Sequence, residues 1–353
     1  MSNRVVRCVC AVFCFFFSVF PFTKRKEQNI VFAQKTVAAV AEGKAECVME
    51  AKSRRILYAK NAETTLPMAS TTKIITAAVV LENCSDLQEK ICIPKQAEGI
   101  EGSSVYLKCG DFYTVEELLY GLMLRSGNDC AVALSLHTAK NQTVFAQKMN
   151  KIAEKAGAIK SCFKNPHGLP QEGHYTTARD LSLITCYAYQ NPVFREIIAT
   201  KYYEKRHWKN KNKMLTLYKG GIGVKTGYTK QAGRCLVSAA TRENMTLICT
   251  LLNCPTTYER TIQLLDDAFF AYRNVVVLEK NATFEFEFNN QTWSGYTKES
   301  YTYPLLEEEF EWLEIKTFPI WPFQSSVNGE KIVGKFEIYL AKDLLFSGNL
   351  YKL

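Results

Sequence analysis

The chain has 353 residues, of which 47% are hydrophobic and 22% are charged, and its formal net charge is +9. This composition is that of a globular protein with room for a catalytic domain and a smaller one, and it argues against an intrinsically disordered chain. The positive charge is modest and no nucleic-acid-binding motif accompanies it, so we expect no nucleic-acid partner.

Residues 1–33 have the pattern of a secretory signal. Arg4 and Arg7 precede the apolar stretch 8–22, and three basic residues, 24–26, follow it. At about fifteen residues the stretch is short for a membrane span. We therefore expect a cleaved signal peptide, with an uncleaved N-terminal anchor as the alternative. In both cases the rest of the chain is expected to be exported and to work at the wall, at the outer membrane face or in a periplasm.

Cysteine is frequent in this chain, with 13 residues, of which three lie in the predicted leader. Several of the others occupy apolar segments, where a small buried thiol packs well. No CxxC pair or Cys/His cluster marks a metal site. We expect mostly free, buried thiols, and neither a metal nor a cofactor.

After the leader, two short strands are predicted at 45–50 and 55–59, joined by a polar turn. Ser70 precedes the apolar segment 74–81, which predicts a buried helix. Residues 114–139 predict another helix, capped by Thr114 and with acidic residues in its first turn.

A further helix is predicted to begin within 175–180. The pattern then changes to strands at 223–227, 235–240 and 245–252, and residues 259–272 are helical again. Strands at both ends of a helical middle predict an α+β domain over residues 34–275.

Residues 276–353 differ in character from the preceding domain. Hydrophobic and polar residues alternate strictly over 283–288 and approximately over 331–340. We predict a small all-β C-terminal domain. No motif in it carries chemistry, so we interpret it as a spacer or docking domain.

Ser70-Thr71-Thr72-Lys73 supplies a nucleophile and its base. A lysine deprotonates a serine only when burial or neighbouring cations lower its pKa. With Ser70 at a helix start, Lys73 lies on the same face one turn on, and the amide of Ser70 is a candidate half of an oxyanion hole. A second S-x-x-K match begins at Ser161, but Pro166 disfavours helix there and excludes it.

Ser126-Gly127-Asn128 follows an apolar run and predicts a turn that aims two short polar side chains into a cleft. Ser126 is a candidate to pass a proton to a leaving amine. Asn128 is a candidate to bind a substrate amide or to hold Lys73 in place.

Lys225-Thr226-Gly227 is the only K-T-G triplet in the chain and lies in a strand-like context. Lys225 and Thr226 are candidates to bind a substrate carboxylate. Gly227 lets a substrate backbone come close, and the amide of Tyr228 would complete the oxyanion hole. In this order, the three motifs predict an acyl-transfer site.

The basic segment 201–219 interleaves lysine and arginine with tyrosine, histidine and tryptophan. The simpler interpretation is a solvated loop or hairpin face. The alternative is a rim that attracts anions and faces an acidic wall polymer.

Sequence blocks around the motifs extend the pattern, at 66–73, 102–104, 118–129, 165–169, 175–180 and 223–229. With these blocks, residues 45–275 resemble the serine-type D-alanyl-D-alanine carboxypeptidases, the low-molecular-mass penicillin-binding proteins. The resemblance implies a β-lactamase/transpeptidase-like fold, an antiparallel sheet flanked by helices with the active site at their junction. The all-β segment then resembles the C-terminal domain that such enzymes often carry. Cys130 stands where alanine is usual, which we interpret as a packing exchange.

The activity implied by the resemblance is removal of the terminal D-alanine from peptidoglycan stem pentapeptides through an acyl-enzyme on Ser70, as part of cell-wall biogenesis and cell shape. β-Lactam antibiotics are the implied covalent inhibitors. Arg260, near the start of the last helix of the domain, is a candidate to meet the terminal carboxylate, with a surface arginine as the alternative. The chain shows no C-terminal amphipathic anchor helix, so membrane attachment is expected only through residues 1–33.

Two other functions stay open. A serine β-lactamase shares the nucleophile and lysine, but class A enzymes deacylate with a glutamate. None of the glutamates between the second and third motifs lies in an E-x-x-x-N context, namely Glu154, Glu172, Glu196 and Glu204. We therefore expect slow deacylation and trapping by penicillins. The other possibility is a wall-binding or sporulation-associated scaffold with a vestigial site.

Overall fold

The structure, a computed structural model, describes residues 40–288, 291–326 and 328–353. They form two compact units, one over Val40–Asn274 and one over Val275–Leu353. The predicted leader, 1–33, lies outside the described residues. In the part of the chain that the structure describes, no helix combines the length and hydropathy needed to cross a membrane.

A five-stranded antiparallel sheet in the order β2-β1-β9-β8-β7 forms the centre of the first unit. Its strands are β1 (Ala45–Glu50), β2 (Ile56–Lys60), β7 (Gly221–Thr229), β8 (Gly233–Arg242) and β9 (Met245–Leu252). All five strands were predicted from the sequence and are confirmed. The pairing of β1 with β9 joins segments about two hundred residues apart. Among the described strands, β7 is at the edge of the sheet with no partner on its outer side.

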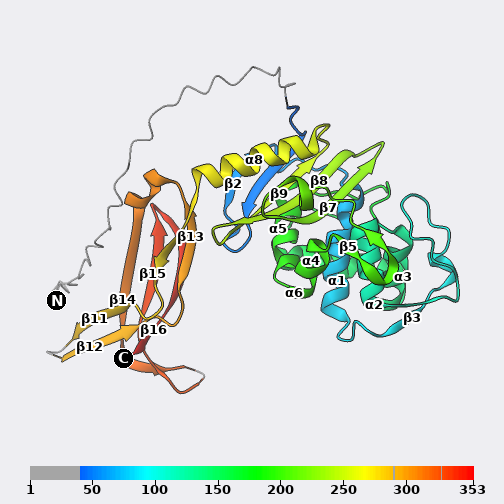
Figure 1. The fold of residues 1–353 in the computed structure, drawn as a ribbon. Helices are drawn as coiled ribbons and strands as arrows, with labels where there is room; N and C mark the ends of the chain where they lie inside the picture. The colour runs from blue at the N-terminus through cyan, green and yellow to red at the C-terminus, as the bar shows by residue number, and fades with distance from the viewer. Residues whose placement is uncertain (1–39, 289–290, 327) are drawn as a thin grey trace, which may run out of the picture. The chain divides into compact units, whose positions relative to one another are not determined.

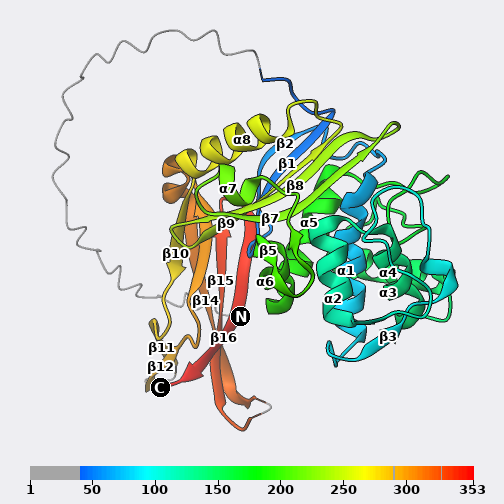
Figure 2. The same cartoon turned by 45° about the vertical axis from the view of Figure 1, so that its right-hand side comes forward.

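Helices cover both faces of this sheet (Figures 1 and 2). On one face lie α7 (Met214–Leu217) and α8 (Thr257–Ala271). The layer on the other face consists of α1 (Lys73–Asn83), α2 (Val115–Tyr120), α3 (Asn128–Thr138), α4 (Gln142–Ala156), α5 (Ala178–Tyr189) and α6 (Pro192–Ala199). Because helices cover both faces, β8 is buried over 235–240 and β9 at all but one position, and apolar residues predominate in these buried runs.

The segment 114–139 is not one helix, as predicted, but two helices with a break between them. Thr114 caps α2 through a reciprocal bond with Glu117, as the sequence indicated. A π-helical turn over Gly121–Arg125 follows, and Ser126 then takes a left-handed conformation with φ of 66°. Such π turns often occur at functional sites. The break places Ser126 at the start of α3 and not within a continuous helix.

Short elements complete the first unit. The 3-10 turn η1 (Ala69–Thr72) precedes α1, β3 (Lys90–Cys92) pairs with β4 (Phe112–Thr114), and β5 (Tyr202–Tyr203) pairs with β6 (Trp208–Lys209). The remaining short turns are η2 (Lys95–Ala97) and η4 (Glu204–Arg206). The ten cysteines among the described residues are free thiols, and six of them are buried.

The second unit is a β domain with its own core. Its main sheet has the order β11-β12-β16-β15-β14, and β10 pairs with β13 beside it. The strands are β10 (Arg273–Leu278), β11 (Thr283–Phe288), β12 (Gln291–Tyr296), β13 (Tyr301–Leu305), β14 (Leu313–Ser325), β15 (Lys331–Leu340) and β16 (Asp343–Lys352). Phe336, Ile338 and Leu350 are among the buried residues. The predicted change to strands is confirmed, and one 3-10 turn, η5 (Glu307–Trp312), lies among those described.

Candidate active site

Ser70 and Lys73 lie side by side at the junction of the sheet and the helical layer. Ser70 is in η1, and Lys73 is the first residue of α1, so the serine lies in a 3-10 turn just before the α-helix. The Lys73 Nζ is 3.0 Å from the Ser70 Oγ. The spacing of three residues therefore brings base and nucleophile into hydrogen-bond contact, as the sequence predicted.

The Lys73 side chain is fully buried, and two other groups share its nitrogen. Nζ donates to the Asn128 Oδ1 and to the backbone oxygen of His167, each at 2.7 Å. Burial, and secondarily the charge of Lys225, hold the pKa of Lys73 well below its usual value. A neutral amine has two N–H groups and one lone pair. In that form the two carbonyl oxygens would take both N–H groups, and the lone pair could accept the proton of the Ser70 hydroxyl.

Asn128 connects Lys73 to the loop around Gly102. Its Nδ2 donates to the backbone oxygen of Glu101 at 2.5 Å. Its backbone nitrogen donates to the backbone oxygen of Ser103 at 2.7 Å. Buried Asp129 holds the next part of the loop by accepting from the Ser104 hydroxyl at 2.6 Å. Of the two roles predicted for Asn128, the structure contains the contact with Lys73.

Cys130 fills a narrow space behind this turn. It is fully buried, and burial raises the pKa of its thiol well above the usual value. A Cβ added to Gly121 or Gly127 would lie 2.6 or 2.8 Å from its sulfur. The thiol is thus a neutral packing group, in agreement with the packing exchange inferred from the sequence.

The K-T-G triplet lies on β7, the edge strand next to η1. A Cβ added to Gly227 would lie 3.2 Å from the Ser70 nitrogen and 3.0 Å from the Met68 oxygen. Glycine is therefore needed for the close approach of β7 to the serine turn. The unpaired edge of β7 can add an extended peptide as a further strand. Ser70 and Tyr228, whose amides are the predicted oxyanion hole, lie at this contact.

Lys225 is 2% exposed, and burial, assisted by the charge of Lys211, lowers its pKa to about 7. Its Nζ donates to the backbone oxygen of Thr226 at 3.0 Å. Lys225 also lowers the pKa of Lys73, so the two ammonium positions are electrostatic neighbours. The site therefore concentrates positive charge where an anionic group of a substrate would bind.

Lys211 is a charged residue near the site that sequence analysis did not single out. It is exposed, its charge lowers the pKa of both Lys73 and Lys225, and its backbone nitrogen donates to the Leu124 oxygen at 3.1 Å. Other basic residues of segment 201–219 face elsewhere, since Lys205 and Arg206 pair with Glu116 and Glu117. The basic segment 201–219 indicated positive charge in this region, but no sequence feature distinguished Lys211 from its other lysines and arginines.

The loop 165–169 packs against the turn η1, which carries Ser70. Gly168 has φ of 89°, and a Cβ there would lie 1.9 Å from the Ala69 oxygen, so backbone packs directly on backbone. The His167 Nδ1 accepts from the Leu169 nitrogen at 3.2 Å. Burial, and secondarily the charge of Lys73, lower the pKa of His167 to about 3.

His174 is a second residue that sequence analysis missed as part of the site. Its Nδ1 accepts from the Lys164 nitrogen, so Nε2 carries the proton and donates to the Thr72 Oγ1, both at 3.0 Å. The Thr72 hydroxyl in turn donates to the Ala69 oxygen at 2.8 Å. Burial lowers the pKa of His174 to about 4. This chain of bonds positions the turn that carries Ser70.

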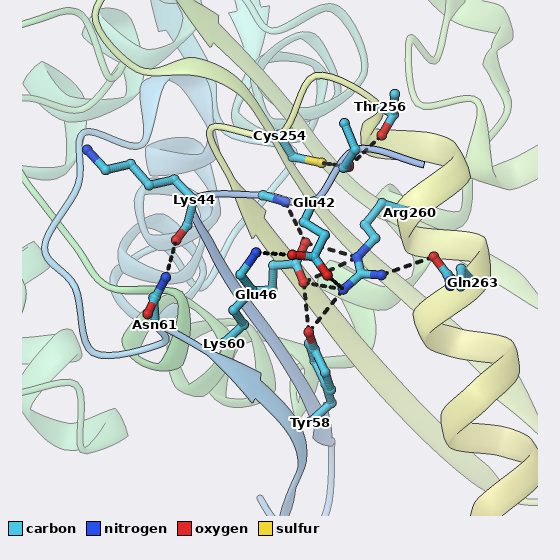
Figure 3. A network of polar contacts seen from close by, with 12 residues as sticks. Glu42, Lys44, Glu46, Tyr58, Lys60, Asn61, Cys254, Thr256, Arg260 and Gln263 are labelled. Atoms are coloured by element: carbon cyan, nitrogen blue, oxygen red, sulfur yellow. Dashed lines mark hydrogen bonds and ion pairs between the residues drawn. The ribbon is translucent and has the colours of Figure 1, made fainter. Parts of the chain in front are cut away.

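Arg260 is not part of this cluster in the structure, and at 6% exposure it is not the surface arginine of the alternative either. Helix α8 lies on the opposite face of the sheet, and Figure 3 shows the guanidinium directed at Glu46 on β1. Its Nη2 and Nε donate to the Glu46 carboxylate at 2.7 and 3.0 Å, and Nη2 also contacts Tyr58 at 3.0 Å. A second carboxylate, that of Glu42, lies 3.4 Å away. The Arg260 guanidinium is therefore paired with carboxylates of this domain, those of Glu46 and Glu42.

These features define the class of protein: a serine acyl-transfer enzyme with a lysine base, in a β-lactamase/transpeptidase-like fold. The comparison with known families makes this specific. The D-alanyl-D-alanine carboxypeptidase family model matches residues 32–256, and the chain belongs to that family.

Among the residues that the structure describes, no group of His, Cys, Asp or Glu side chains could hold a metal ion.

Individual relatives agree with the family. The D-alanyl-D-alanine carboxypeptidase DacF of Bacillus subtilis is 32% identical over 264 residues, which cover 71% of this chain and 68% of the relative. DacC of Escherichia coli is 31% identical over 281 residues, covering 74% and 70%. Both carry the enzyme name that the sequence motifs predicted.

Solved structures confirm the predicted fold class. Penicillin-binding protein 5 of Haemophilus influenzae matches with a TM-score of 0.74 at 25% identity, over 89% of this chain and 97% of that one. A mutant of the DD-transpeptidase of Streptomyces K15 is 34% identical and matches with a TM-score of 0.62, over 65% and 98%. The first match extends over both units of this chain, and the second is shorter.

Proposed function

We propose that this protein is an exported serine carboxypeptidase that removes the terminal D-alanine from peptidoglycan stem pentapeptides through an acyl-enzyme on Ser70. The observation that carries the proposal is the buried Lys73 Nζ, which lies 3.0 Å from the Ser70 Oγ and donates to two carbonyl oxygens at 2.7 Å. Family membership supports the choice of substrate.

Acylation begins when the Ser70 oxygen attacks the carbonyl of the D-Ala-D-Ala bond and Lys73 takes the hydroxyl proton. The amides of Ser70 and Tyr228 stabilise the oxyanion. Ser126, 5% exposed and next to Asn128, passes a proton to the leaving amine. Terminal D-alanine leaves, and water then releases the shortened stem peptide from Ser70.

The terminal carboxylate binds at the basic end of the site. Lys225 and Thr226 hold it, and Lys211 takes the role for which Arg260 was the sequence-based candidate. Burial lowers the pKa of Lys225 and so favours its neutral form. A bound carboxylate stabilises the protonated form and raises this pKa again. Binding of the substrate therefore restores the charge that recognises it.

Release of D-alanine tests this function directly. Purified protein incubated with a stem pentapeptide should release one D-alanine per peptide, and Ser70→Ala should release none. If the unmodified protein releases no D-alanine while a fluorescent penicillin still labels Ser70, the carboxypeptidase function is wrong. If penicillin does not label Ser70 either, the scaffold with a vestigial site is the better description.

The β-lactamase alternative makes a different prediction. The groups that contact Lys73 and Ser70 are hydroxyl, amide and carbonyl oxygens rather than a glutamate. We therefore expect a penicillin to remain covalently attached, with the mass of the intact protein raised by one penicillin for many minutes. Rapid return to the unmodified mass with continued penicillin consumption would favour a β-lactamase.

Export is proposed from residues 1–33, which lie outside the described residues. Arg4 and Arg7 followed by the apolar stretch 8–22 support a signal peptide or N-terminal anchor. Fractionation of cells expressing the full chain, combined with N-terminal sequencing, should find it outside the cytoplasm and distinguish a cleaved leader from an anchor. Recovery in the cytoplasm at full length would contradict export.

A further inference from the structure

The proposed catalytic roles give the substrate a direction along β7. The terminal carboxylate binds beside Lys225 and Thr226, whereas the scissile carbonyl lies at the amide of Tyr228, further along the same strand. A peptide that extends along the free edge of β7 therefore continues from Tyr228 toward Thr229 and the turn between β7 and β8. This is the direction in which the acyl-donor part of the stem peptide leaves the nucleophile.

A pocket of about 580 Å³ lies where that direction leads. We call it the hairpin pocket, and it is lined by residues 65–67, 170–175 and Gln231. Gln231 is in the turn after β7, residues 65–67 come just before η1, and 170–175 follow the loop that packs on Ala69. Its volume is within the range of small-molecule sites. All three walls thus continue from segments that build the catalytic site.

The walls of the hairpin pocket are held in place by bonds within the described chain. The backbone groups of Leu66 and Thr176 exchange hydrogen bonds at 2.8 and 3.0 Å. The Gln171 Oε1 accepts from the Asn165 Nδ2 at 3.0 Å, and its backbone oxygen accepts from the His174 nitrogen at 3.1 Å. The pocket is therefore formed before any ligand binds, which reduces the entropy cost of binding.

The lining combines apolar surface with one charged group. Leu66, Pro67, Pro170 and Tyr175 supply apolar area, while Glu172 supplies a carboxylate. Glu172 is exposed, and among the residues that the structure describes no lysine or arginine nitrogen lies within ion-pair distance of it. An aliphatic chain that ends in an ammonium group matches these surfaces, since its methylenes can lie on the apolar walls and its charge can reach Glu172.

We propose that the hairpin pocket is a specificity subsite for an amine-bearing side chain on the acyl-donor part of the stem peptide, and that Glu172 recognises its ammonium group. The inference rests on the proposed carboxypeptidase function for the direction of the substrate. Glu172 takes no part in the bond-breaking steps, so the subsite affects which substrate is used and leaves the chemistry at Ser70 unchanged.

The test uses two peptides that end in D-Ala-D-Ala and are preceded by lysine, one with a free and one with an acetylated side-chain amine. The full-length protein should hydrolyse the free-amine peptide with a kcat/KM about fivefold higher, the scale of a solvent-accessible ion pair. Raising the ionic strength should reduce this preference. Glu172→Gln should abolish the preference, so that the two peptides are hydrolysed with the same kcat/KM.

Glu154→Gln is the matched control, because Glu154 is an exposed carboxylate on α4 outside the pocket. It should keep the full preference. An equal loss in both variants, or retention of the preference in Glu172→Gln, would overturn the subsite.

A second readout separates this inference from the proposed function. Acylation of Ser70 is compared for two penicillins whose acyl side chains end in a primary amine or in its acetylated form. The same dependence on Glu172 is expected, even if no peptide is hydrolysed. Loss of D-alanine release with a preserved penicillin preference would contradict the carboxypeptidase function alone, whereas equal acylation by both penicillins would overturn the subsite.

Discussion

Three lysines of the site differ in environment, and the differences assign their tasks. Lys73 is fully buried and its pKa is held far below its usual value, so it is available as a base. Lys225 is almost as buried, and its pKa is about 7. Lys211 is exposed and acts on both through its charge. In the proposed mechanism these three lysines are a proton acceptor, a cation that titrates near neutral pH and a neighbouring positive charge.

The pKa of Lys225 predicts the alkaline side of the pH profile. Above about pH 7 the free enzyme loses the ammonium that binds the carboxylate, so the second-order rate of acylation by penicillin should fall, approaching tenfold per pH unit. Lys225→Arg keeps the charge and should move the fall to higher pH. The measurement is the acylation rate from pH 5 to 10, and an unchanged alkaline fall in the arginine variant would refute the assignment.

His174 predicts a dependence of stability on acidity. Its pKa is about 4 in the folded protein, compared with about 6.5 in an unfolded chain. The unfolded state therefore binds more protons between these values, so stability is retained above pH 6.5 and lost as the pH falls toward 4. His174 alone should lower the free energy of unfolding by about 2 kcal/mol at pH 5 relative to pH 7. Urea titrations of the unmodified protein and of His174→Gln at both pH values measure this difference in the free energy of unfolding. An equal effect of pH in both proteins would show that His174 does not cause it.

At the scale of elements, three segments from distant parts of the chain meet at the serine. Turn η1 carries Ser70, β7 passes its open side, and the loop 165–169 packs behind it. The two close approaches occur at Gly227 and Gly168. Elements can come this near only where no side chain intervenes, so glycines at the contacts determine how precisely the nucleophile is placed.

Gly168→Ala tests this packing. The added methyl would lie 1.9 Å from the Ala69 oxygen and would push the serine turn away from Lys73, so penicillin acylation should fall by about a hundredfold. Gly173→Ala is the matched control in the same segment. Gly173 also has a positive φ, of 73°, but its nearest neighbour is the flexible end of Lys164 at 3.1 Å. That variant should lose about 1 kcal/mol of stability and keep its rate of acylation by a penicillin whose acyl side chain carries no amine. Equal acylation rates in the two variants would argue against the packing role.

The break between α2 and α3 belongs to the same scale. Apolar residues at 118–119 and 122–124 continue through the π turn, so the sequence predicted one helix where the structure contains two. The left-handed conformation of Ser126 and the bond from Gly127 to Gly121 turn the chain back on itself. A strained residue of this kind persists only when its surroundings hold it, here at the wall of the active site.

At the scale of the whole molecule, the sheet separates two sides with different tasks. The side that carries α1 holds the candidate catalytic residues, and the side that carries α8 holds the ion pair of Arg260 and Glu46. Glu46 is fully buried, and its carboxylate also accepts from the backbone nitrogen of Gly43 at 2.6 Å. This network ties the first strand of the fold to its last helix, far from the chemistry.

Arg260→Met should therefore weaken folding without altering catalysis. It leaves the Glu46 carboxylate buried without its partner, which costs about 3 to 5 kcal/mol of the free energy of unfolding. The rate of penicillin acylation of the folded protein should stay within about twofold of normal, because the variant changes no group at Ser70. Glu259→Gln, an exposed change on the same helix, should cost less than about 0.5 kcal/mol. A large loss of acylation with normal stability would instead support a role for Arg260 in the active site.

The sequence by itself determined the parts of the site that depend on local spacing. The step of three residues from Ser70 to Lys73 spans about one helical turn, and that geometry holds wherever the helix packs. Apolar periodicity likewise predicted the strands β7, β8 and β9, helix α8 and the all-β second unit. These features follow from backbone geometry and from burial of one face, which act over a few residues.

Only the tertiary structure decided which distant groups meet. Leu264 and Leu265 on α8 place Arg260 on the stripe that faces the sheet, but no local pattern says which face of the sheet that helix covers. Lys211 was one cation among several until packing placed its charge beside Lys225. The same holds for the His174 bond to Thr72 across 102 residues. Contacts of this kind depend on the packing of whole layers, so the motifs predicted the chemistry while the packing selected the residues that support it.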